Sequence, residues 1–183
     1  TPFARLAHAG LSSSGFFGWA TAIAGTHVVV GARNEGLVGA AYVYDLANAP
    51  PARPVLELKS PHSTSYGAYG GAVAMSGTRL AVGDVGRDIS AGINESVFIY
   101  DINDVNPGVP ILTLENPDGE LWALFGYAVA MSGPRIVVAA IWQDAGAVDA
   151  GSAYVFDLTS AAPRVPIARL ANPMPALQDY FGN

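Results

Sequence analysis

The 183-residue sequence contains no cysteine, which excludes disulfide bonds and cysteine-ligated metal sites without fixing the cellular compartment. Charged residues are scarce, at 13% of the chain, whereas hydrophobic residues make up 51%. This balance is typical of a packed globular protein rather than a disordered one. The net charge of −6 leaves no basic surface that could neutralise phosphates, so nucleic acid is not an expected partner.

Long apolar runs and helical periodicity are also missing. No apolar stretch approaches the roughly 20 residues that span a membrane, so membrane insertion is not expected. The opening TPFARLAHAG lacks a basic segment followed by an apolar one and predicts no signal peptide, although a mature or excised chain would look the same. Glycine (21) and proline (13) are abundant instead, which favours many short strands joined by tight turns.

An internal repeat organises the whole chain. An aromatic–glycine pair occurs four times, at spacings of 52, 56 and 56 residues, and a leucine lies 11 residues before each pair. An aromatic–aspartate pair recurs at spacings of 56 residues. Because these marks share one period, they predict repeats at approximately 1–54, 55–110 and 111–166, with 167–183 beginning a further one. The repeated residues are Phe17, Gly18, Tyr69, Gly70, Phe125, Gly126, Phe181 and Gly182, and the aspartates Asp45, Asp101 and Asp157.

Each repeat predicts four β-strands. "FGYAVAM" alternates large and small residues, "RIVVAA" is typical of a strand buried on both faces, "GSAYVFDL" follows, and a proline-containing turn leads to a strand such as "VPILTLENP". Four-stranded units with a period of about 50 residues predict an all-β β-propeller, with 1–183 as a single arc or part-propeller. We expect the aromatic–glycine strands nearest the axis, where the aromatic fills the wedge between blades and glycine permits close backbone approach.

The segments "FG", "AVAMSG", "VVVGA" and "GSAYVFDL" resemble the bacterial variety of the FG-GAP repeat of integrin-α-like β-propellers. The resemblance implies a propeller blade, usually extracellular or at the cell surface, that serves adhesion, ligand binding or scaffolding. Many members of this family carry an acidic calcium loop between the second and third strands. The corresponding loops here, 84–94 and 140–151, lack the family's Asp-x-Asp-x-Asp-Gly run, so the resemblance supports the fold rather than a calcium site.

Three aspartates are the candidate calcium ligands: Asp88 in the first of these loops, and Asp144 and Asp149 in the second. Calcium takes six to eight oxygen ligands, several of them carboxylates. Each loop offers at most two aspartates, so weak or absent binding is expected. The alternative is a solvated turn, a setting that Asp, Asn and Gly favour. No other cofactor is predicted.

Two tryptophans are the candidate ligand-binding residues. Trp122 lies three residues before Phe125, and Trp142 lies in the loop 140–151. Exposed aromatics at blade edges stack on sugars or anchor protein partners, so a glycan is a candidate ligand; the alternative for both is packing between blades. The repeated aspartates are expected to end the third strand of each blade in an Asx-type turn.

No catalytic site is predicted. The three histidines fall at unrelated repeat positions, no Gly-x-Ser-x-Gly elbow occurs, and the acidic residues lie mainly in predicted turns. Paired carboxylates that converge in space would escape this search, so a hydrolase or lyase on a propeller scaffold remains an alternative.

The repeat arithmetic predicts association. Three blades cannot close a ring, since propellers have about four to eight, and an open arc exposes apolar blade faces. We therefore expect either further blades of a longer chain or self-association, with "PFARLAHA" and "PIARLANP" as equivalent end pieces. The leading hypothesis is a non-enzymatic extracellular or cell-surface module for protein binding, adhesion or assembly. A lectin-like propeller is the first alternative.

Overall fold

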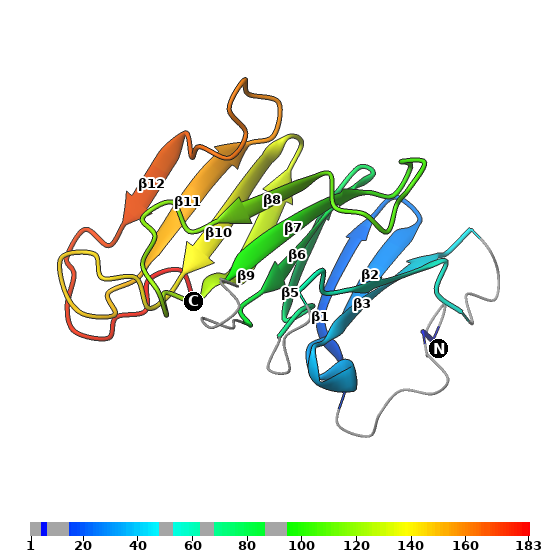
Figure 1. The fold of residues 1–183 in the computed structure, drawn as a ribbon, viewed down its shortest axis with the longest axis horizontal. Helices are drawn as coiled ribbons and strands as arrows, with labels where there is room; N and C mark the ends of the chain where they lie inside the picture. The colour runs from blue at the N-terminus through cyan, green and yellow to red at the C-terminus, as the bar shows by residue number, and fades with distance from the viewer. Residues whose placement is uncertain (1–4, 7–14, 48–52, 63–67, 87–94) are drawn as a thin grey trace.

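The computed structural model describes residues 5–6, 15–47, 53–62, 68–86 and 95–183. Asp88 and most of the loop 84–94 lie outside the described residues. Within them the chain is all-β, with one short 3₁₀-helix, η1 (Glu35–Leu37), and three four-stranded antiparallel sheets side by side in an open arc (Figure 1). The prediction of three four-stranded propeller blades is confirmed.

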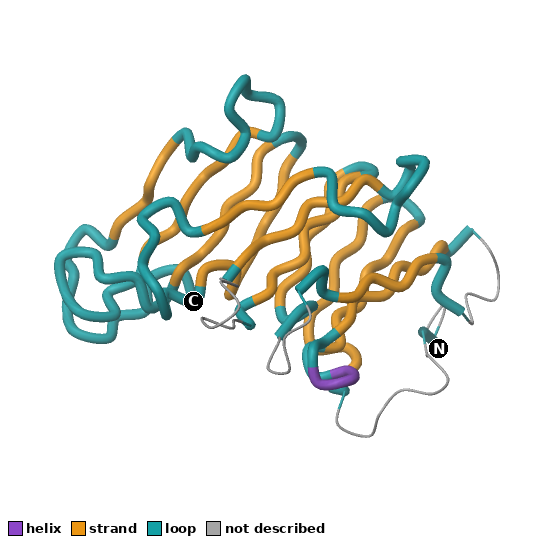
Figure 2. Tube along the Cα trace, in the orientation of Figure 1, coloured by secondary structure: helices purple, strands orange, loops and turns teal. Residues whose placement is uncertain are grey.

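Each blade is a meander whose strand order follows the chain, and the loops gather at its two ends (Figure 2). Blade 1 consists of β1 (Phe17–Ala24), β2 (His27–Ala32), β3 (Ala40–Asp45) and β4 (Leu56–Lys59). Blade 2 consists of β5 (Ala72–Ser76), β6 (Arg79–Asp84), β7 (Ser96–Asp101) and β8 (Leu112–Glu115). Blade 3 consists of β9 (Phe125–Ser132), β10 (Arg135–Ala140), β11 (Ser152–Asp157) and β12 (Ala168–Ala171). Each blade therefore begins at, or just after, its aromatic–glycine pair and ends at a leucine-containing strand.

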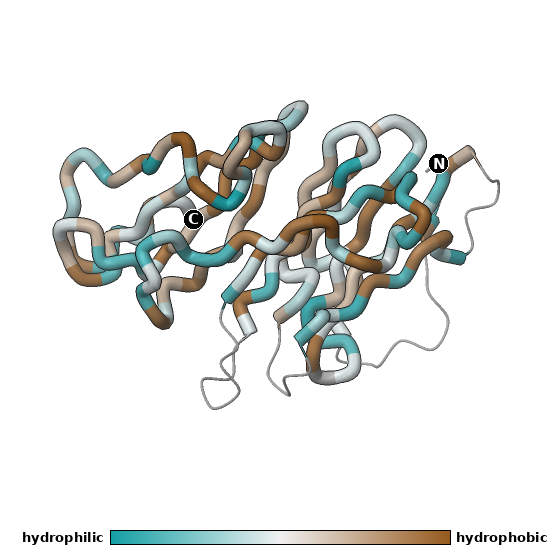
Figure 3. The backbone as a smooth tube through the Cα atoms, turned by 45° about the horizontal axis from the view of Figure 1, so that its top comes forward, coloured by the Kyte–Doolittle hydropathy of each residue, from teal (hydrophilic) through white to brown (hydrophobic). Residues whose placement is uncertain are grey.

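The two middle strands of blade 2, which lies between the other two blades, are apolar because both of their faces are covered. In β6 and β7, every residue from Leu80 to Asp84 and from Ser96 to Tyr100 is buried. β-Branched and aromatic residues suit such strands because they pack well on a pleated surface. Hydrophobic segments accordingly recur in all three sheets (Figure 3).

Two apolar clusters join the three blades. Between blades 1 and 2, Leu58 of β4 and Val43 of β3 meet Tyr69 and Tyr100. The same repeat positions meet between blades 2 and 3, where Leu114 of β8 takes the place of Leu58. Each junction buries one aromatic of the aromatic–glycine pair, Tyr69 or Phe125, at 0% exposure. The repeated aromatic is thus a wedge between blades.

The glycine of the pair allows the strand to approach the preceding blade. β1, β5 and β9 form the inner edges of the sheets and pack on one another. Gly70 has φ +80°, in the left-handed region that favours glycine, and a Cβ added there would overlap the carbonyl oxygen of Ala40. Gly18, Gly126 and Gly182 also have positive φ, from +92° to +101°.

The C-terminal segment continues the pattern beyond blade 3. The backbone N–H of Phe181 donates to the Ala150 carbonyl (2.9 Å), as the N–H of Tyr69 donates to the Val38 carbonyl (3.2 Å). Gly182 lies against Ala139 of β10. The last residues therefore occupy the place where the strand of a following blade would begin.

Candidate functional site

The outer face of blade 3 is the first candidate site, because it carries interior residues that are left uncovered. We call the side chains of Ala130, Val137, Val155, Ala168 and Leu170 the blade-3 face. Leu170 is 45% exposed, whereas Leu58 and Leu114, which hold the same place in blades 1 and 2, are 2% and 0% exposed. Burying such a leucine is worth about 1.5–3 kcal/mol.

The same contrast holds for the valines of this face. Val137 and Val155 are half-buried, whereas Val29 and Val43 at the equivalent positions of blade 1 are 0% exposed. All four strands of blade 3 contribute to the face, so it is a continuous sheet surface rather than a scatter of single residues. Its apolar residues are the ones that line a junction between blades, but no following blade covers them.

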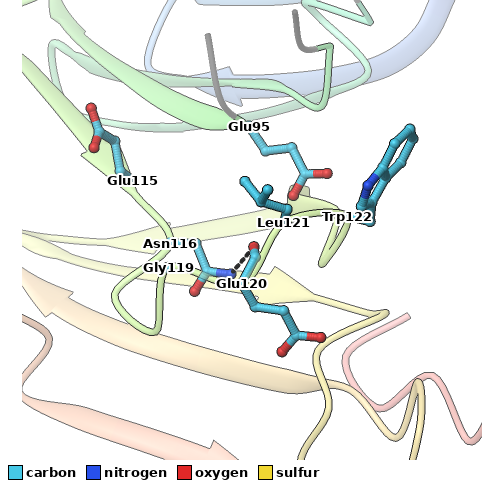
Figure 4. Close-up of a pocket in the computed structure, with 7 residues that line it drawn as sticks. All are labelled: Glu95, Glu115, Asn116, Gly119, Glu120, Leu121 and Trp122. Carbon is cyan, nitrogen blue, oxygen red and sulfur yellow. Dashed lines mark hydrogen bonds between the residues drawn. The ribbon is translucent and has the colours of Figure 1, made fainter. Parts of the chain in front are cut away.

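A second candidate is a pocket of about 90 Å³ where the loop after β8 passes blade 2 (Figure 4). Trp122, 59% exposed, forms its rim, and the carboxylates of Glu95 and Glu120 lie near it. Trp142 is 40% exposed, and its backbone N–H donates to the Ala123 carbonyl (2.9 Å). The pocket's wall includes Trp122 but not Trp142, and it is made of Glu95, Glu115, Asn116, Gly119, Glu120, Leu121 and Trp122.

The acidic side chains around this pocket hold the loops together. The Glu120 carboxylate accepts the backbone N–H of Asp144 (3.0 Å) and the side-chain amide of Gln143. Burial raises the pKa of Glu120, partly offset by the hydrogen bond from Asp144. Glu95 Oε2 accepts the backbone N–H of Phe125 (2.9 Å). These hydrogen bonds place the carboxylates in structural roles.

The candidate calcium ligands Asp144 and Asp149 lie in one loop. Asp144 Oδ1 accepts the backbone N–H of Asp149 (2.9 Å), so this carboxylate closes its own loop. In the described part of the chain, no three His, Cys, Asp or Glu side chains group as they would around a metal ion. The third candidate, Asp88, lies outside the described residues.

The repeated aspartates end the third strand of each blade. Oδ1 of Asp45, Asp101 and Asp157 accepts the backbone N–H of the second residue after each, at 2.9–3.0 Å, which is the Asx-turn geometry. The hydrogen bond from Ala47 lowers the pKa of Asp45, and the Thr159 hydroxyl lowers that of Asp157. Their recurrence therefore has a structural explanation.

Sequence reasoning missed a third candidate, a pocket of about 100 Å³ at the inner edges of the blades. Trp19, Gly71 and Tyr127 line it, and each directly follows an aromatic–glycine pair. The Arg33 guanidinium carbon lies 4.5 Å from the centre of the Trp19 ring. An alignment of the three repeats could have predicted this pocket, because blades 1 and 3 have an aromatic residue at the position where blade 2 has glycine.

Asp84 is a buried carboxyl at the junction of blades 1 and 2, where blades 1 and 3 have Ala32 and Ala140. It is 1% exposed and accepts hydrogen bonds from the Ser60 hydroxyl (2.6 Å) and the Gly86 backbone N–H (3.0 Å). Burial is the largest influence and raises its pKa above the ordinary 3.8, against these hydrogen bonds and the nearby His62. Ionisation of Asp84 therefore opposes folding.

We expect Asp84→Asn to raise the melting temperature at pH 7 and to have no effect near pH 3. A carboxyl with a raised folded-state pKa supports folding fully below its unfolded value of 3.8, and that contribution is lost as pH rises through the folded pKa. The amide keeps an acceptor for Gly86 and a partner for Ser60. Thermal melts from pH 3 to 8 measure the effect, with Asp104→Asn on an exposed turn as the control. A pH-independent difference between Asp84→Asn and the native chain would contradict it.

Comparison with known families identifies the repeat. The family model described as "FG-GAP repeat" matches residues 3–44 and 113–156, together just under half of the chain. The chain carries FG-GAP repeats. Blade 2, most of which lies between the two matched segments, has the same four-stranded topology as the others.

Solved structures support the fold. The crystal structure of the computationally designed Ika4 protein is similar with a TM-score of 0.55 and 16% identity, covering 94% of this chain and 82% of that chain. No curated protein matches this FG-GAP chain. In the parts of the chain that the structure describes, no helix has the length and hydrophobicity to cross a membrane.

Proposed function

We propose that this FG-GAP chain is a non-enzymatic β-propeller module, extracellular or at the cell surface, that acts in protein binding, adhesion or assembly. The observation that carries the proposal is the uncovered blade-3 face. FG-GAP propellers are commonly binding modules and typically extracellular. The structural hydrogen bonds of Glu95 and Glu120 support a non-catalytic role for the acidic Trp122 pocket.

Another FG-GAP blade is the partner that this face matches. Within the chain, the equivalent faces of blades 1 and 2 are covered by the blade that follows. The aromatic–glycine pair Phe181-Gly182 already lies at the inner end of the blade-3 face. A matching blade would bury Leu170 and Val155 as Leu114 and Ile99 are buried in blade 2.

A second copy of the chain offers such a blade. Ile23 on β1 is 63% exposed, whereas Met75, its equivalent on β5, is 8% exposed because blade 1 covers it. On the same side of blade 1, Val30, Tyr42 and Tyr44 are buried and Leu6 packs against their cluster, so this end of the arc exposes Ile23 rather than a whole blade face. Complementary ends of an arc join head to tail into rings or filaments. We propose that the blade-3 face of one copy packs on the β1 side of another.

We expect the chain to self-associate in a concentration-dependent way and Leu170→Glu to abolish this. A glutamate at Leu170 would place a charge inside the junction, where it has no partner. Val105→Glu is the matched control, since Val105 is 92% exposed and lies in the loop after β7. Sedimentation velocity or light scattering from low to high micromolar concentration measures the mass. A native chain with the mass of a single copy throughout, or equal association by Leu170→Glu, would contradict the proposal.

Glycan binding at the Trp122 pocket is the second candidate function. The observation in its favour is an indole that is 59% exposed beside carboxylates and the Asn116 amide, a combination that can stack on a sugar ring and bind its hydroxyls. A glycan array separates the two functions, because a blade junction binds no sugar.

A further inference from the structure

The axial pocket, formed by Trp19, Arg33, Gly71 and Tyr127, owes its shape to one substitution in the repeat. Trp19 and Tyr127 lie on β1 and β9, and these residues are 53% and 41% exposed. Blade 2 has Gly71 at the same position, so no side chain fills the space between the two rings. A Cβ added at Gly71 would lie 2.9 Å from the Ala68 carbonyl oxygen, so even alanine is too large there without a shift of the backbone.

Arg33 gives this pocket its charge. The equivalent residues of blades 2 and 3 are Val85 and Ile141, so the guanidinium occurs on blade 1 alone. It stacks on Trp19, and its Nε is enclosed without a hydrogen-bond partner. Among the described residues, no carboxylate forms an ion pair with it.

An arginine in this state has unused binding capacity. The chain has 15 acidic residues against nine Lys and Arg, so carboxylates are plentiful, yet none of those described is paired with Arg33. A cation–π contact is worth about 0.5–2 kcal/mol and leaves the N–H groups of the guanidinium available as hydrogen-bond donors. The planar fork of donors matches the two oxygens of a carboxylate.

The small volume of the pocket limits which carboxylate ligands can enter it. Sites for whole small molecules usually measure about 300–1,000 Å³, and the axial pocket measures about 100 Å³. It is large enough to enclose a carboxylate with its methylenes, whereas a sugar ring could only stack on its rim, as proposed for the Trp122 pocket. The Trp19 and Tyr127 rings would pack on the methylenes and keep water from the ion pair.

We propose that the axial pocket binds the carboxylate of a glutamate or aspartate side chain presented by a protein partner, with Arg33 as the anion-binding residue and Trp19 and Tyr127 as the walls. The carboxylate accepts hydrogen bonds from the Arg33 guanidinium. The residues that line this site include none of the blade-3 face.

The test titrates the full chain with the peptide acetyl-Gly-Glu-Gly-amide and follows the indole N–H resonances by NMR. The chain has three tryptophans, and the Trp19→Phe variant identifies the Trp19 signal by its loss. We expect a saturable shift of that signal with a Kd in the millimolar range, and no shift with acetyl-Gly-Gln-Gly-amide. We expect Arg33→Gln to weaken binding at least tenfold and Arg33→Lys to weaken it less, since lysine keeps the charge and loses the fork.

The control is Arg135→Gln, which removes one positive charge from an exposed strand start and should leave the peptide's Kd unchanged. If Arg33→Gln fails to fold, the comparison of Arg33→Lys with Arg135→Lys carries the test. The proposal is overturned by the absence of a saturable shift, by equal binding of the glutamine peptide, or by equal binding to the Arg33 and Arg135 variants. Saturable binding of sodium glucuronate without binding of the glutamate peptide would also overturn it, in favour of an acidic sugar.

Discussion

Leu114→Ala is expected to lower the free energy of unfolding by about 2–5 kcal/mol, whereas Leu170→Ala lowers it by less than about 1 kcal/mol. The two leucines occupy the same position of the repeat, on β8 and β12. Leu114 is 0% exposed between blades 2 and 3, and Leu170 is 45% exposed on the blade-3 face. Truncation at Leu114 leaves a cavity in a closed junction, but truncation at Leu170 removes a side chain that already contacts water.

Urea unfolding followed by circular dichroism measures both values, at the lowest practical protein concentration so that any association is weak. Leu58→Ala serves as a second interior position, since Leu58 is 2% exposed at the junction of blades 1 and 2. Equal losses at Leu114 and Leu170 under these conditions would mean that the blade-3 face is covered within the single chain. A loss at Leu170 that grows with protein concentration would instead support the proposed association.

The sequence predicted the blades because their determinants are local and repeated. The aromatic–glycine pair, the two apolar middle strands and the aspartate turn recur at one spacing, and each has a physical role within its own blade or at the next junction. The Asx turns show this directly, since the carboxylate and the backbone N–H it accepts are only two residues apart.

The candidate sites were less predictable because their partners come from other blades. Glu95 stands where blades 1 and 3 have Gly39 and Gly151, and its carboxylate accepts the N–H of Phe125, 30 residues later. No residue near Glu95 in the sequence predicts that contact. Asp84 likewise binds Ser60 across a blade junction, 24 residues away.

The acidic loop of blade 3 shows a limit of motif reasoning. Asp144 and Asp149 suggested calcium by their spacing within a family loop, but spacing does not reveal which donors each carboxylate already accepts. Asp144 accepts the N–H of Asp149, and Glu120, 24 residues before Asp144, joins the same loop. The axial pocket was missed for a related reason, since Arg33 lies outside the repeated marks and acquires its role only where the inner strands converge.

Gly70→Ala is expected to destabilise the protein by about 2–5 kcal/mol, because it combines two penalties. A non-glycine residue at φ +80° costs about 1–2 kcal/mol. The new Cβ would also overlap the Ala40 carbonyl oxygen, forcing the inner strand away from blade 1, and overpacking of this kind costs about 1–3 kcal/mol. The pair Tyr69-Gly70 would no longer fit the junction that it anchors.

Gly18→Ala separates the two penalties. Gly18 is the same residue of the repeat and has φ +92°, but no described atom lies within 4 Å of a Cβ added there. Gly18→Ala should therefore lower the free energy of unfolding by only about 1–2 kcal/mol, the part due to backbone conformation. Urea unfolding of both variants gives the difference, which measures the close approach of the blades. If Gly70→Ala and Gly18→Ala lower the free energy of unfolding equally, the glycine of each aromatic–glycine pair is required only for its backbone angle. The proposed role of glycine in the close approach of neighbouring blades would then be wrong.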